Sequence, residues 1–348
     1  MNSEKDSVIL LAHGDGGKKS SDLVNGLLVK HLGNSILSKL EDSAIFDFPG
    51  RKTAFTTDSF TVKPVFFPGG DIGKLCVCGT VNDLAVCGCS PLALSLSLII
   101  EEGFSYADLE KIVLSIKKTL SLTTVKYGIV TGDTKVVEKG GADGIFINTA
   151  GIGYFDSSRI MSPLNIKEGD DIVLNGSIAE HGISLLSRRP EFNFKTKIIS
   201  DCAPLDSLIS GMLSASSNIH ALRDATRGGL ARVLIEMAQS SGLDFEIFEE
   251  NIPVKREARG ICEFLGLDPL YIANEGKIAA FINPEDTARV IGAMKENEYG
   301  KDSAVIGRVI KNSGNKKSGE PGRVVLVTRF NTKRLLDIYY SEQLPRIC

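Results

Sequence analysis

Strand-like and helix-like segments alternate along two successive stretches of this 348-residue chain, and this alternation restricts the possible fold strongly. Runs rich in β-branched and apolar residues predict strands, and apolar runs with helical spacing predict helices. In the first stretch the predicted strands span 53–60, 91–100, 127–137 and 144–155, and the predicted helices span 71–88 and 105–120, the latter with Ser105 as its N-cap. Such alternation is typical of α/β (α+β) domains, and the length suits two of them.

The turn-forming segment SPLNIKEGD at 162–170 is the predicted boundary between the two stretches. Beyond it the alternation resumes and ends with the strand-like RVVLVTRF. We therefore predict a lead-in with a glycine loop and a helix, two α/β domains and a C-terminal tail. Their predicted ranges are 1–40, 41–160, 161–335 and 336–348.

Charge and composition limit the partners. The 43 acidic residues slightly exceed the 40 Lys and Arg, and no long basic block is present, so we expect neither nucleic acid nor an anionic membrane as a partner. The first ten residues carry acids and lack the apolar core of a signal peptide. The apolar run at 90–100 is too short to span a bilayer. We expect a cytoplasmic location, where the seven cysteines remain reduced.

A glycine-rich segment, HGDGGKKS, occupies residues 13–20. It is not a Walker A loop, because that motif needs a glycine at position 12 and a Ser or Thr directly after Lys18. Three glycines close to two lysines still let backbone N–H groups and an ammonium approach an anion. A flexible turn is the alternative. The candidate residues are Gly14, Gly16 and Gly17.

Three aspartates have positions that suit a cation. Asp58 lies in a predicted strand, Asp133 follows the strand-like YGIVTG, and Asp83 lies in an otherwise apolar helix. Magnesium prefers a few carboxylates together with substrate phosphates. A solvated turn or a helix cap is the alternative for each of them. Lys135 should project to the same side of its strand as Asp133.

The segment Asp224–Gly229 precedes a predicted helix over 229–242. Glycines at a helix start expose N–H groups at the positive end of the helix dipole, which suits a phosphate or a carboxylate. Plain helix capping is the alternative. The candidate ligand-binding residues here are Thr226, Arg227 and Gly228.

Glu275 lies in the mostly apolar stretch YIANEGKIAAFI. A carboxylate among apolar residues is a candidate base with a shifted pKa. A turn between two strands is the alternative.

The internal cysteines and the histidines do not point to a functional site. The C-x-C pairs do not match the C-x₂₋₄-C spacing of a zinc knuckle, so we expect these cysteines to pack as small apolar side chains. The histidines are scattered and receive no role. The residues concerned are Cys76, Cys78, Cys87, Cys89, His31, His181 and His220.

Cys348 differs in kind, because it is the last residue given for the chain. A terminal thiol can swing into a pocket or toward another protein, which a mid-chain thiol cannot do. Pro345 stiffens the approach and Ile347 offers an apolar anchor. An accidental tail cysteine is the alternative. Prenylation is excluded, since it needs the cysteine four residues from the end.

Taken together, these segments resemble the HypE family of hydrogenase maturation factors, within the aminoimidazole-ribotide-synthetase-like ATP-binding superfamily. The resemblance covers nearly the whole chain. Two departures from the family pattern lie at Asp15 and Ala225, where a serine and a proline are common, and the cysteines at 87 and 89 are not typical either. The matching motifs are HGDGG at 13–17, the segment 56–88, TGDTKVV at 131–137, RDATRGGLARVL at 223–234, DPLYIANEGK at 268–277 and the final PRIC.

The resemblance implies a two-domain fold and a homodimer in which the N-terminal domains form a shared sheet or barrel with ATP near their interface. It also implies that a carbamoyltransferase, HypF, delivers a carbamoyl group to Cys348 on a flexible tail. ATP then drives the dehydration of this thiocarboxamide to a thiocyanate. The cyanide passes to a HypC–HypD scaffold and becomes a ligand of the [NiFe]-hydrogenase iron.

With this resemblance, the candidate residues take on roles. The Gly14–Gly17 loop would cover the phosphates, and Thr134, Thr226, Arg227 and Gly228 would join it in binding the nucleotide. Lys135 would offset charge on the transferred phosphoryl group, and Glu275 would be the base. The magnesium ligands would be Asp58, Asp83 and Asp133.

Two other functions compete. One is a related enzyme, such as selenophosphate synthetase or thiamine-monophosphate kinase. The synthetase typically carries a reactive Cys or selenocysteine in its glycine loop, whereas the first cysteine here is Cys76, and the kinase needs no terminal thiol. The other is a non-catalytic carrier, whose Cys348 only binds iron or a partner.

Overall fold

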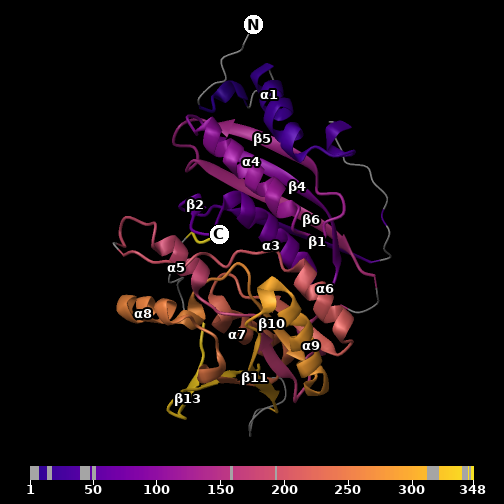
Figure 1. Ribbon diagram of the computed structural model, residues 1–348, viewed down its shortest axis with the longest axis vertical. Helices are drawn as coiled ribbons and strands as arrows, with labels where there is room; N and C mark the ends of the chain where they lie inside the picture. Colours follow the sequence, from indigo (N-terminus) through magenta and orange to yellow (C-terminus); the bar gives the residue numbers. More distant parts are fainter. Residues whose placement is uncertain are drawn as a thin grey trace.

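Two β-sheets, one above the other in Figure 1, organise the computed structural model. A four-stranded sheet comes from the first half of the chain, and a seven-stranded sheet from the second half. The structure describes residues 8–13, 18–39, 48, 52–156, 160–192, 194–311, 321–338, 344 and 346–348.

The first sheet has the strand order β1-β6-β4-β5. β4 pairs with β5 in parallel and with β6 in antiparallel fashion, and β1 lies at the edge beside β6. The four strands confirm the predicted ones to within a few residues at each end. They are β1 (Thr53–Phe60), β4 (Ser90–Glu101), β5 (Ile129–Val137) and β6 (Ile145–Tyr154).

Helices α3 (Ile72–Val86) and α4 (Tyr106–Leu120) cover one face of this sheet. Asp71 caps α3 by accepting hydrogen bonds from the N–H groups of Gly73 and Lys74. Ser105 caps α4, as predicted, by accepting from the N–H of Asp108. α3 is buried nearly all round, because it lies between the sheet, α4 and the second half of the molecule.

The lead-in helix is present within the described residues 18–32, as one helical run in three parts. Its buried leucines pack into the same core as α4, which holds the lead-in against the first sheet. The parts are α1 (Lys18–Leu23), the π-helical η2 (Val24–Val29) and α2 (Lys30–Leu32).

The second sheet has the order β13-β12-β9-β11-β7-β10-β8. Its strands are β7 (Asp171–Leu174), β8 (Ile219–Asp224), β9 (Asp244–Phe248), β10 (Ile278–Ile282), β11 (Ala304–Ile310), β12 (Val324–Val327) and β13 (Lys333–Leu335). α6 (Asp206–Ala215) and α9 (Pro284–Glu296) pack on one face through a separate apolar cluster. α7 (Gly229–Ser241) packs on the other face.

Shorter elements complete the described chain. They are the strands β2 (Phe66–Phe67) and β3 (Gly70–Asp71), the helices α5 (Glu180–Leu186) and α8 (Arg256–Leu265), and the 3₁₀ turns η1 (Leu11–His13), η3 (Leu37–Lys39), η4 (Pro163–Asn165), η5 (Glu249–Asn251), η6 (Pro269–Tyr271) and η7 (Glu298–Gly300). No helix in the described part of the chain is long and apolar enough to cross a membrane.

The two halves meet along α3. The side-chain amide of Asn82 is buried there, where it donates to the carbonyl of Ala203 and accepts from the N–H of Leu205. Asp206, at the start of α6, accepts from the N–H and hydroxyl of Thr124. These bonds fix how the halves sit together. The domain limits predicted from the sequence remain a prediction.

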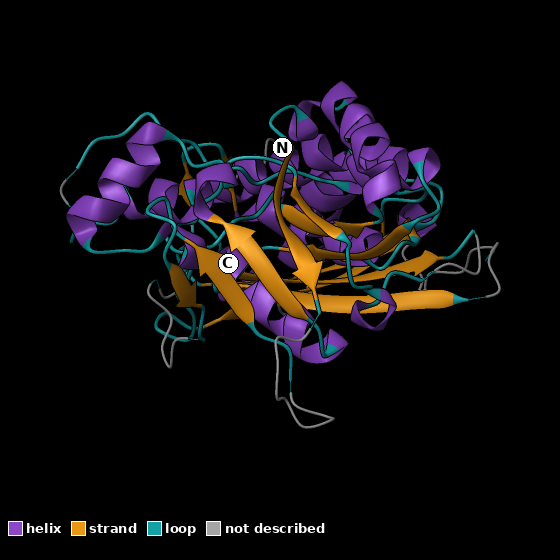
Figure 2. Ribbon diagram, turned by 90° about the horizontal axis from the view of Figure 1, so that it is seen from below, coloured by secondary structure: helices purple, strands orange, loops and turns teal. Residues whose placement is uncertain are grey.

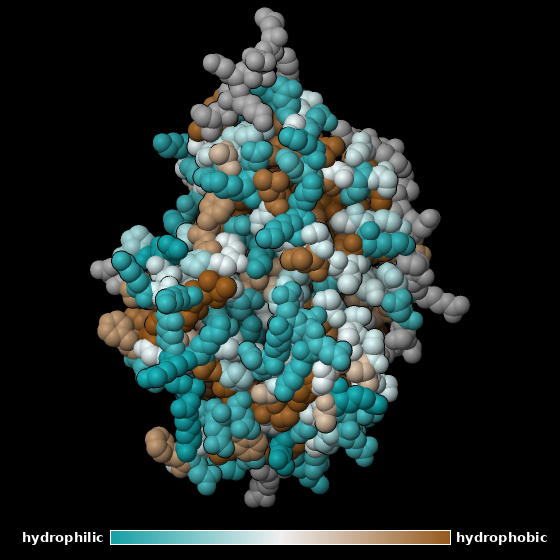
Figure 3. Space-filling view, in the orientation of Figure 1, coloured by the Kyte–Doolittle hydropathy of each residue, from teal (hydrophilic) through white to brown (hydrophobic). Residues whose placement is uncertain are grey.

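The helices do not cover the whole molecule evenly. Figure 2 shows most of them on one side of the strands, and Figure 3 shows that the face seen in Figure 1 is mainly hydrophilic. The face of the first sheet that α3 and α4 do not cover carries exposed apolar side chains, with Phe55 73% and Ile99 42% exposed. Such exposed apolar side chains suit a protein contact.

Candidate active site

A polar cavity of about 370 Å³ lies at the junction of the two halves. On one side it is lined by β1 and the C-terminal part of α3, and on the other by the segment from β8 to α7. The first half contributes two aspartates, and the second half contributes side chains of both signs. The cavity lining consists of Asp58, Asp83, Arg223, Asp224, Thr226, Arg227, Arg232, Val233 and Glu236. Carboxylates beside guanidinium groups are what a magnesium ion and phosphate oxygens require together.

Local structure aims the first two carboxylates into this cavity. Asp58 faces α3, since a Cβ added at Gly79 would lie 3.5 Å from its Oδ2. The hydroxyl of Thr56, on the same face of β1, donates to Asp83 Oδ2 at 2.8 Å. The strand and the helix thus bring the two acidic groups together.

The β8–α7 turn supplies the other side of the cavity. β8 ends at Asp224, and the predicted glycine start of α7 is confirmed. Gly228 and Gly229 have φ of 75° and 63°, which favour glycine. A Cβ at Gly229 would also lie 2.6 Å from two carbonyl oxygens. These glycines allow the tight turn that presents Thr226 and Arg227 at the helix start.

Crowding raises the proton affinity of the carboxyl groups. Burial, followed by the charge of Asp83, raises the pKa of Asp58 to about 6. Burial and the same neighbour raise the pKa of Asp224 to about 6, and burial raises that of Asp83. A bound cation would relieve this repulsion, so the residues fit magnesium. No preformed group of three metal-ligating side chains occurs among the described residues, so phosphate and water oxygens would have to complete the shell.

Asp133 and Lys135 lie elsewhere in the chain's own fold. Asp133 lies level with Ser97 of β4 and Asn148 of β6 across the sheet, on the face that α3 and α4 leave uncovered. Its strand, β5, is at the opposite edge of the sheet from β1. Asn148 donates to Ser59 of β1, which places these residues on the face opposite to Asp58. Within one chain, Asp133 is therefore not brought beside Asp58 and Asp83, and its magnesium role stays a prediction.

Lys135 lies on the same side of β5 as Asp133, as predicted, and the two side chains form an ion pair. Its Nζ lies 3.0 Å from the Asp133 carboxylate, and both side chains are exposed. Thr134, between them, points to the other face of β5. The glycines Gly14, Gly16 and Gly17 lie outside the described residues.

Glu275 is a buried carboxyl group, 3% exposed, just before β10. Burial, then Cys202 and Asp201, raise its pKa well above the usual value. Its Oε1 has no hydrogen-bond partner among the described residues. The carboxyl group is therefore strongly basic once ionised, and one oxygen is available for a ligand.

The loop around Glu275 is held by Asp201. The N–H groups of Glu275 and Gly276 donate to its two carboxylate oxygens, each at 3.2 Å. Lys277 lies 3.1 Å from the same carboxylate, and both side chains are nearly fully buried. Because a Cβ at Gly276 would lie only 2.0 Å from the Asp201 carbonyl, the backbones can approach only with glycine there.

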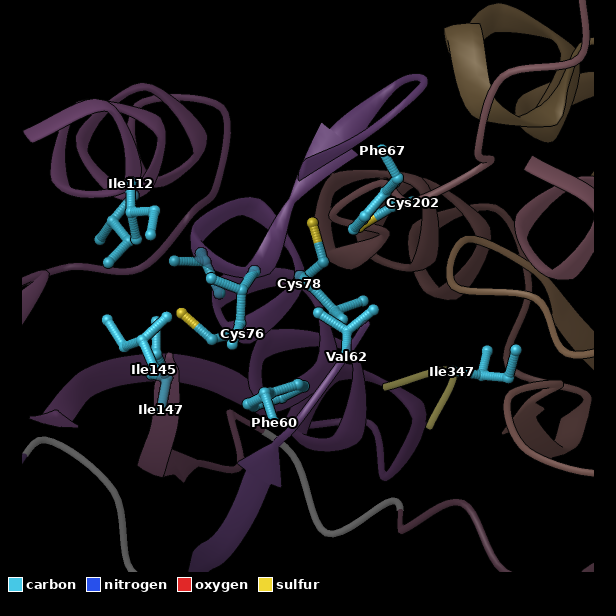
Figure 4. Close-up of a cluster of buried hydrophobic side chains, with 14 of the residues drawn as sticks. Phe60, Val62, Phe67, Cys76, Cys78, Ile112, Ile145, Ile147, Cys202 and Ile347 are labelled. Atoms are coloured by element: carbon cyan, nitrogen blue, oxygen red, sulfur yellow. The ribbon is translucent and has the colours of Figure 1, made fainter. Parts of the chain in front are cut away.

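The C-terminal residues dock at the junction of the two halves, where the C label lies between α3 and α5 (Figure 1). The N–H and hydroxyl of Thr61 donate to the Cys348 main-chain oxygen at 3.1 and 3.2 Å. The N–H of Lys63 donates to the carbonyl of Arg346 at 3.3 Å. Ile347 is 3% exposed and belongs to the apolar cluster that contains Val62 (Figure 4).

The side chain of Arg346 connects the same tail to the residues that flank β1 and β6. The guanidinium of Arg346 donates to the carbonyl of Thr61 at 3.0 Å and pairs with Asp143 at 2.5 Å. Lys63 also pairs with Asp143, at 2.7 Å. Pro345 lies outside the described residues. Main-chain hydrogen bonds, the Arg346 side chain and the buried Ile347 thus hold the terminal residue beside the junction of the two halves.

Several residues at this site gave little or no signal in the sequence. Asp201 and Asp143 lie in loops with no periodicity, and His181 is one of three scattered histidines. His181 is fully buried, and its Nε2 lies 2.9 Å from the carbonyl of Ile347. Arg223 enters the cavity from β8. Only the fold brings these groups together.

Family models match both halves of the chain. The AIR synthase related protein N-terminal domain matches residues 40–155, and the corresponding C-terminal domain matches residues 167–318. The carbamoyl dehydratase HypE of Bradyrhizobium diazoefficiens is 43% identical over 339 residues, covering 97% of this chain and 95% of the relative.

Two solved structures have the same fold. A crystal structure of the hydrogenase maturation protein HypE in complex with ATP has a TM-score of 0.91 and 42% identity, covering 97% of this chain and 99% of that one. A chain in a crystal structure of a HypE–HypF complex has a TM-score of 0.77 and 43% identity, covering 91% and 99%.

Because the pKa of Asp58 is raised, replacing Asp58 by a neutral residue should increase the free energy of unfolding by an amount that depends on pH. The pKa is 3.8 when unperturbed and about 6 in the folded chain, so the folded state holds more protons between these values. The free energy of unfolding therefore falls as pH rises through this window. We expect Asp58→Asn to be more stable than wild type by about 1 kcal/mol near pH 8, after discounting for solvent screening.

Urea unfolding in the presence of a chelator measures this difference. The gain should shrink toward zero near pH 4. Asp143→Asn is the matched control of opposite sign, because hydrogen bonds from Lys63 and Arg346 lower the pKa of Asp143. A gain for Asp58→Asn that is the same at both pH values would contradict the prediction.

Proposed function

The chain belongs to the HypE carbamoyl dehydratases of the AIR synthase related family, and from this premise we propose that it dehydrates a carbamoyl group on its own Cys348 at the expense of ATP. The substrate is the thiocarboxamide, and the product is the thiocyanate that supplies a cyanide ligand for a [NiFe]-hydrogenase. The carboxamide oxygen leaves with the phosphoryl group, ADP and phosphate are released, and two N–H protons are removed.

The observation that carries the proposal is the position of the docked tail. Ile347 packs in the same apolar cluster as Cys202 and Ala273, and Glu275 follows Ala273 by two residues. The charges of Asp224 and Asp58 also contribute to the raised pKa of Glu275. The docked tail, the buried carboxyl group of Glu275 and the acidic cavity therefore all lie at the junction of the two halves, which supports the proposal.

The cavity residues are the proposed site for the ATP phosphates. Arg227 offers a guanidinium, and Thr226 and Gly228 stand at the start of α7, where N–H groups face an anion. Asp58 and Asp83 would hold magnesium, which, when bound, neutralises charge on the phosphates. The Gly14–Gly17 loop is proposed to cover the phosphates.

A second copy of the chain is proposed to complete the site. The open face of the first sheet carries Phe55 and Ile99 as well as the Lys135–Asp133 pair. Packing of two such faces into a shared sheet or barrel would bury the exposed apolar side chains. It would also place Lys135 and Asp133 at a subunit interface, which is where we propose that they and Thr134 meet the nucleotide.

The tail is proposed to alternate between docked and exposed states. A HypF carbamoyltransferase must reach Cys348 to load it, and a HypC–HypD scaffold must reach it to take the cyanide. The described contacts that hold the final residues of the tail are a few hydrogen bonds, one ion pair and the buried side chains of Leu344 and Ile347. Contacts of this kind are weak enough to break and re-form.

Two alternatives remain open to test. A selenophosphate-synthetase- or thiamine-monophosphate-kinase-like enzyme would not need the docked Cys348. A non-catalytic carrier would bind at Cys348 without releasing ADP. The raised pKa and unpartnered oxygen of Glu275 favour a catalytic role over the carrier. The docked Cys348 favours a reaction on its own thiol over the related enzymes.

ATP turnover should depend on the cavity carboxylates. Asp83→Asn removes a proposed magnesium ligand, and we expect ADP formation to fall at least tenfold, about 1.4 kcal/mol of transition-state stabilisation. Asp133→Asn should have a similar effect, through the second subunit of the dimer. The control is Asp302→Asn, at an exposed position far along the chain. Full turnover in a folded Asp83→Asn variant would remove Asp83 from the site.

Glu275 and Lys135 should be needed for conversion of the carbamoylated thiol much more than for nucleotide binding. After loading by the carbamoyltransferase and addition of Mg-ATP, the wild-type Cys348 peptide should lose the mass of one water. Glu275→Gln and Lys135→Ala should bind ATP but keep the thiocarboxamide, because proton removal or charge compensation is missing.

Mass spectrometry of the C-terminal peptide and calorimetric ATP titration supply the two readouts. Glu263→Gln, on the exposed side of α8, is the matched control. If both variants lost ATP binding, they would belong to the nucleotide pocket. If both converted at the wild-type rate, neither residue would act on the thiol.

A further inference from the structure

His181 connects the docked tail to the loop that carries Asp201. It lies in α5 and is 0% exposed. Its Nε2 lies 2.9 Å from the carbonyl oxygen of Ile347, and its Nδ1 lies 2.7 Å from the hydroxyl of Ser200. The imidazole thus contacts the tail with one nitrogen and the loop with the other.

The partners determine the protonation of the ring. A carbonyl oxygen only accepts, so Nε2 of His181 carries the hydrogen that Ile347 receives. Burial lowers the pKa of His181, which favours the neutral ring, and Nδ1 is then an acceptor. The hydroxyl of Ser200 must therefore donate to Nδ1. Each hydrogen bond from Ser200 through His181 to Ile347 therefore has only one possible donor.

The same hydroxyl holds the loop. Ser200 Oγ accepts from the N–H of Cys202 at 3.0 Å, and the N–H of Ser200 donates to Pro68 at 2.7 Å. Between them stands Asp201, whose carboxylate receives the N–H groups that fix Glu275. Hydrogen bonds at both ends, joined by the backbone of residues 200–202, thus connect the tail carbonyl to the backbone of the proposed base.

We propose that His181 is a positioning residue that couples docking of the C-terminal tail to the ordering of the Glu275 loop. The proposal rests on the proposed function of Glu275 and Cys348, and it assigns no chemical step to His181. When the tail leaves, Nε2–H loses its acceptor inside an apolar cluster. A buried donor without a partner is unfavourable, so the loop and the tail should favour the bound arrangement together.

A purely structural role predicts a different outcome. His181 also packs edge-on against Phe67, with ring centroids 5.4 Å apart. If packing were its whole role, an aromatic ring without a donor would replace it at little cost to tail docking. Removal of the hydroxyl of Ser200 would then have no effect on the reaction.

Three variants in the full-length chain separate these roles. His181→Phe keeps a ring and removes both hydrogen bonds. His181→Gln can still donate toward Ile347, and Ser200→Ala keeps the tail contact while it removes the loop contact. The readouts are the alkylation rate of Cys348 with a Cys348→Ala control, conversion of the loaded thiol, ATP affinity, and thermal unfolding.

We expect His181→Phe to alkylate about tenfold faster at Cys348, as expected for the loss of one buried hydrogen bond, with ATP affinity unchanged. His181→Gln should restore slow alkylation in part. Ser200→Ala keeps the contact to the tail but loosens the base loop, so it should convert the thiocarboxamide about tenfold more slowly. Because coupling is reciprocal, its Cys348 should also alkylate faster than in wild type, though less so than in His181→Phe.

Two results would overturn the coupling. One is wild-type alkylation in His181→Phe, and the other is wild-type conversion in Ser200→Ala. If His181→Phe does not fold, Ser200→Ala and His181→Gln still decide. Failure of the wild-type chain itself to convert the thiol would instead refute the proposed function, while the alkylation rates would still test the contact to the tail.

Discussion

Burial of carboxyl groups at the junction of the two halves is the constraint on which the rest of the structure depends. Asp58, Asp83 and Asp224 crowd one cavity, and Glu275 lies buried beside it. Desolvation of several like charges is costly, and it persists only when a fold is held rigidly around it. Asn82 and the buried α3 supply that rigidity. The strain is relieved when a cation or a proton arrives, which is what an ATP-dependent dehydration provides.

The tail is held in a way that suits repeated use. Recognition runs mainly through main-chain groups, with Thr61 and Lys63 donating to tail oxygens. Among the described tail residues, Leu344 and Ile347 add buried side chains, and Arg346 adds an ion pair at a partly exposed site, which contributes little on its own. A tail bound in this way is placed at the junction largely by its main-chain oxygens. In the proposed cycle it accepts a group elsewhere and returns to the junction.

The sequence predicted local features better than it predicted the site. Helical and strand periodicity located α3, α4 and the first sheet, because those signals need only neighbours along the chain. The glycines before α7 were found for the same reason. His181 and Asp201 were missed, since their roles arise from contacts between loops far apart in the sequence. Spacing also could not show that Asp133 faces away from Asp58, because sheet order is a property of the fold.

In the proposed reaction, the oxygen of the carboxamide on Cys348 leaves with the phosphoryl group of ATP while Glu275 removes protons. The most direct measurement loads Cys348 with a carbamoyl group carrying a heavy oxygen isotope and follows the label through one turnover. We expect the label in the released phosphate, with thiocyanate left on Cys348, and neither product in Glu275→Gln. Label released as water, with unlabelled phosphate, would contradict the claim.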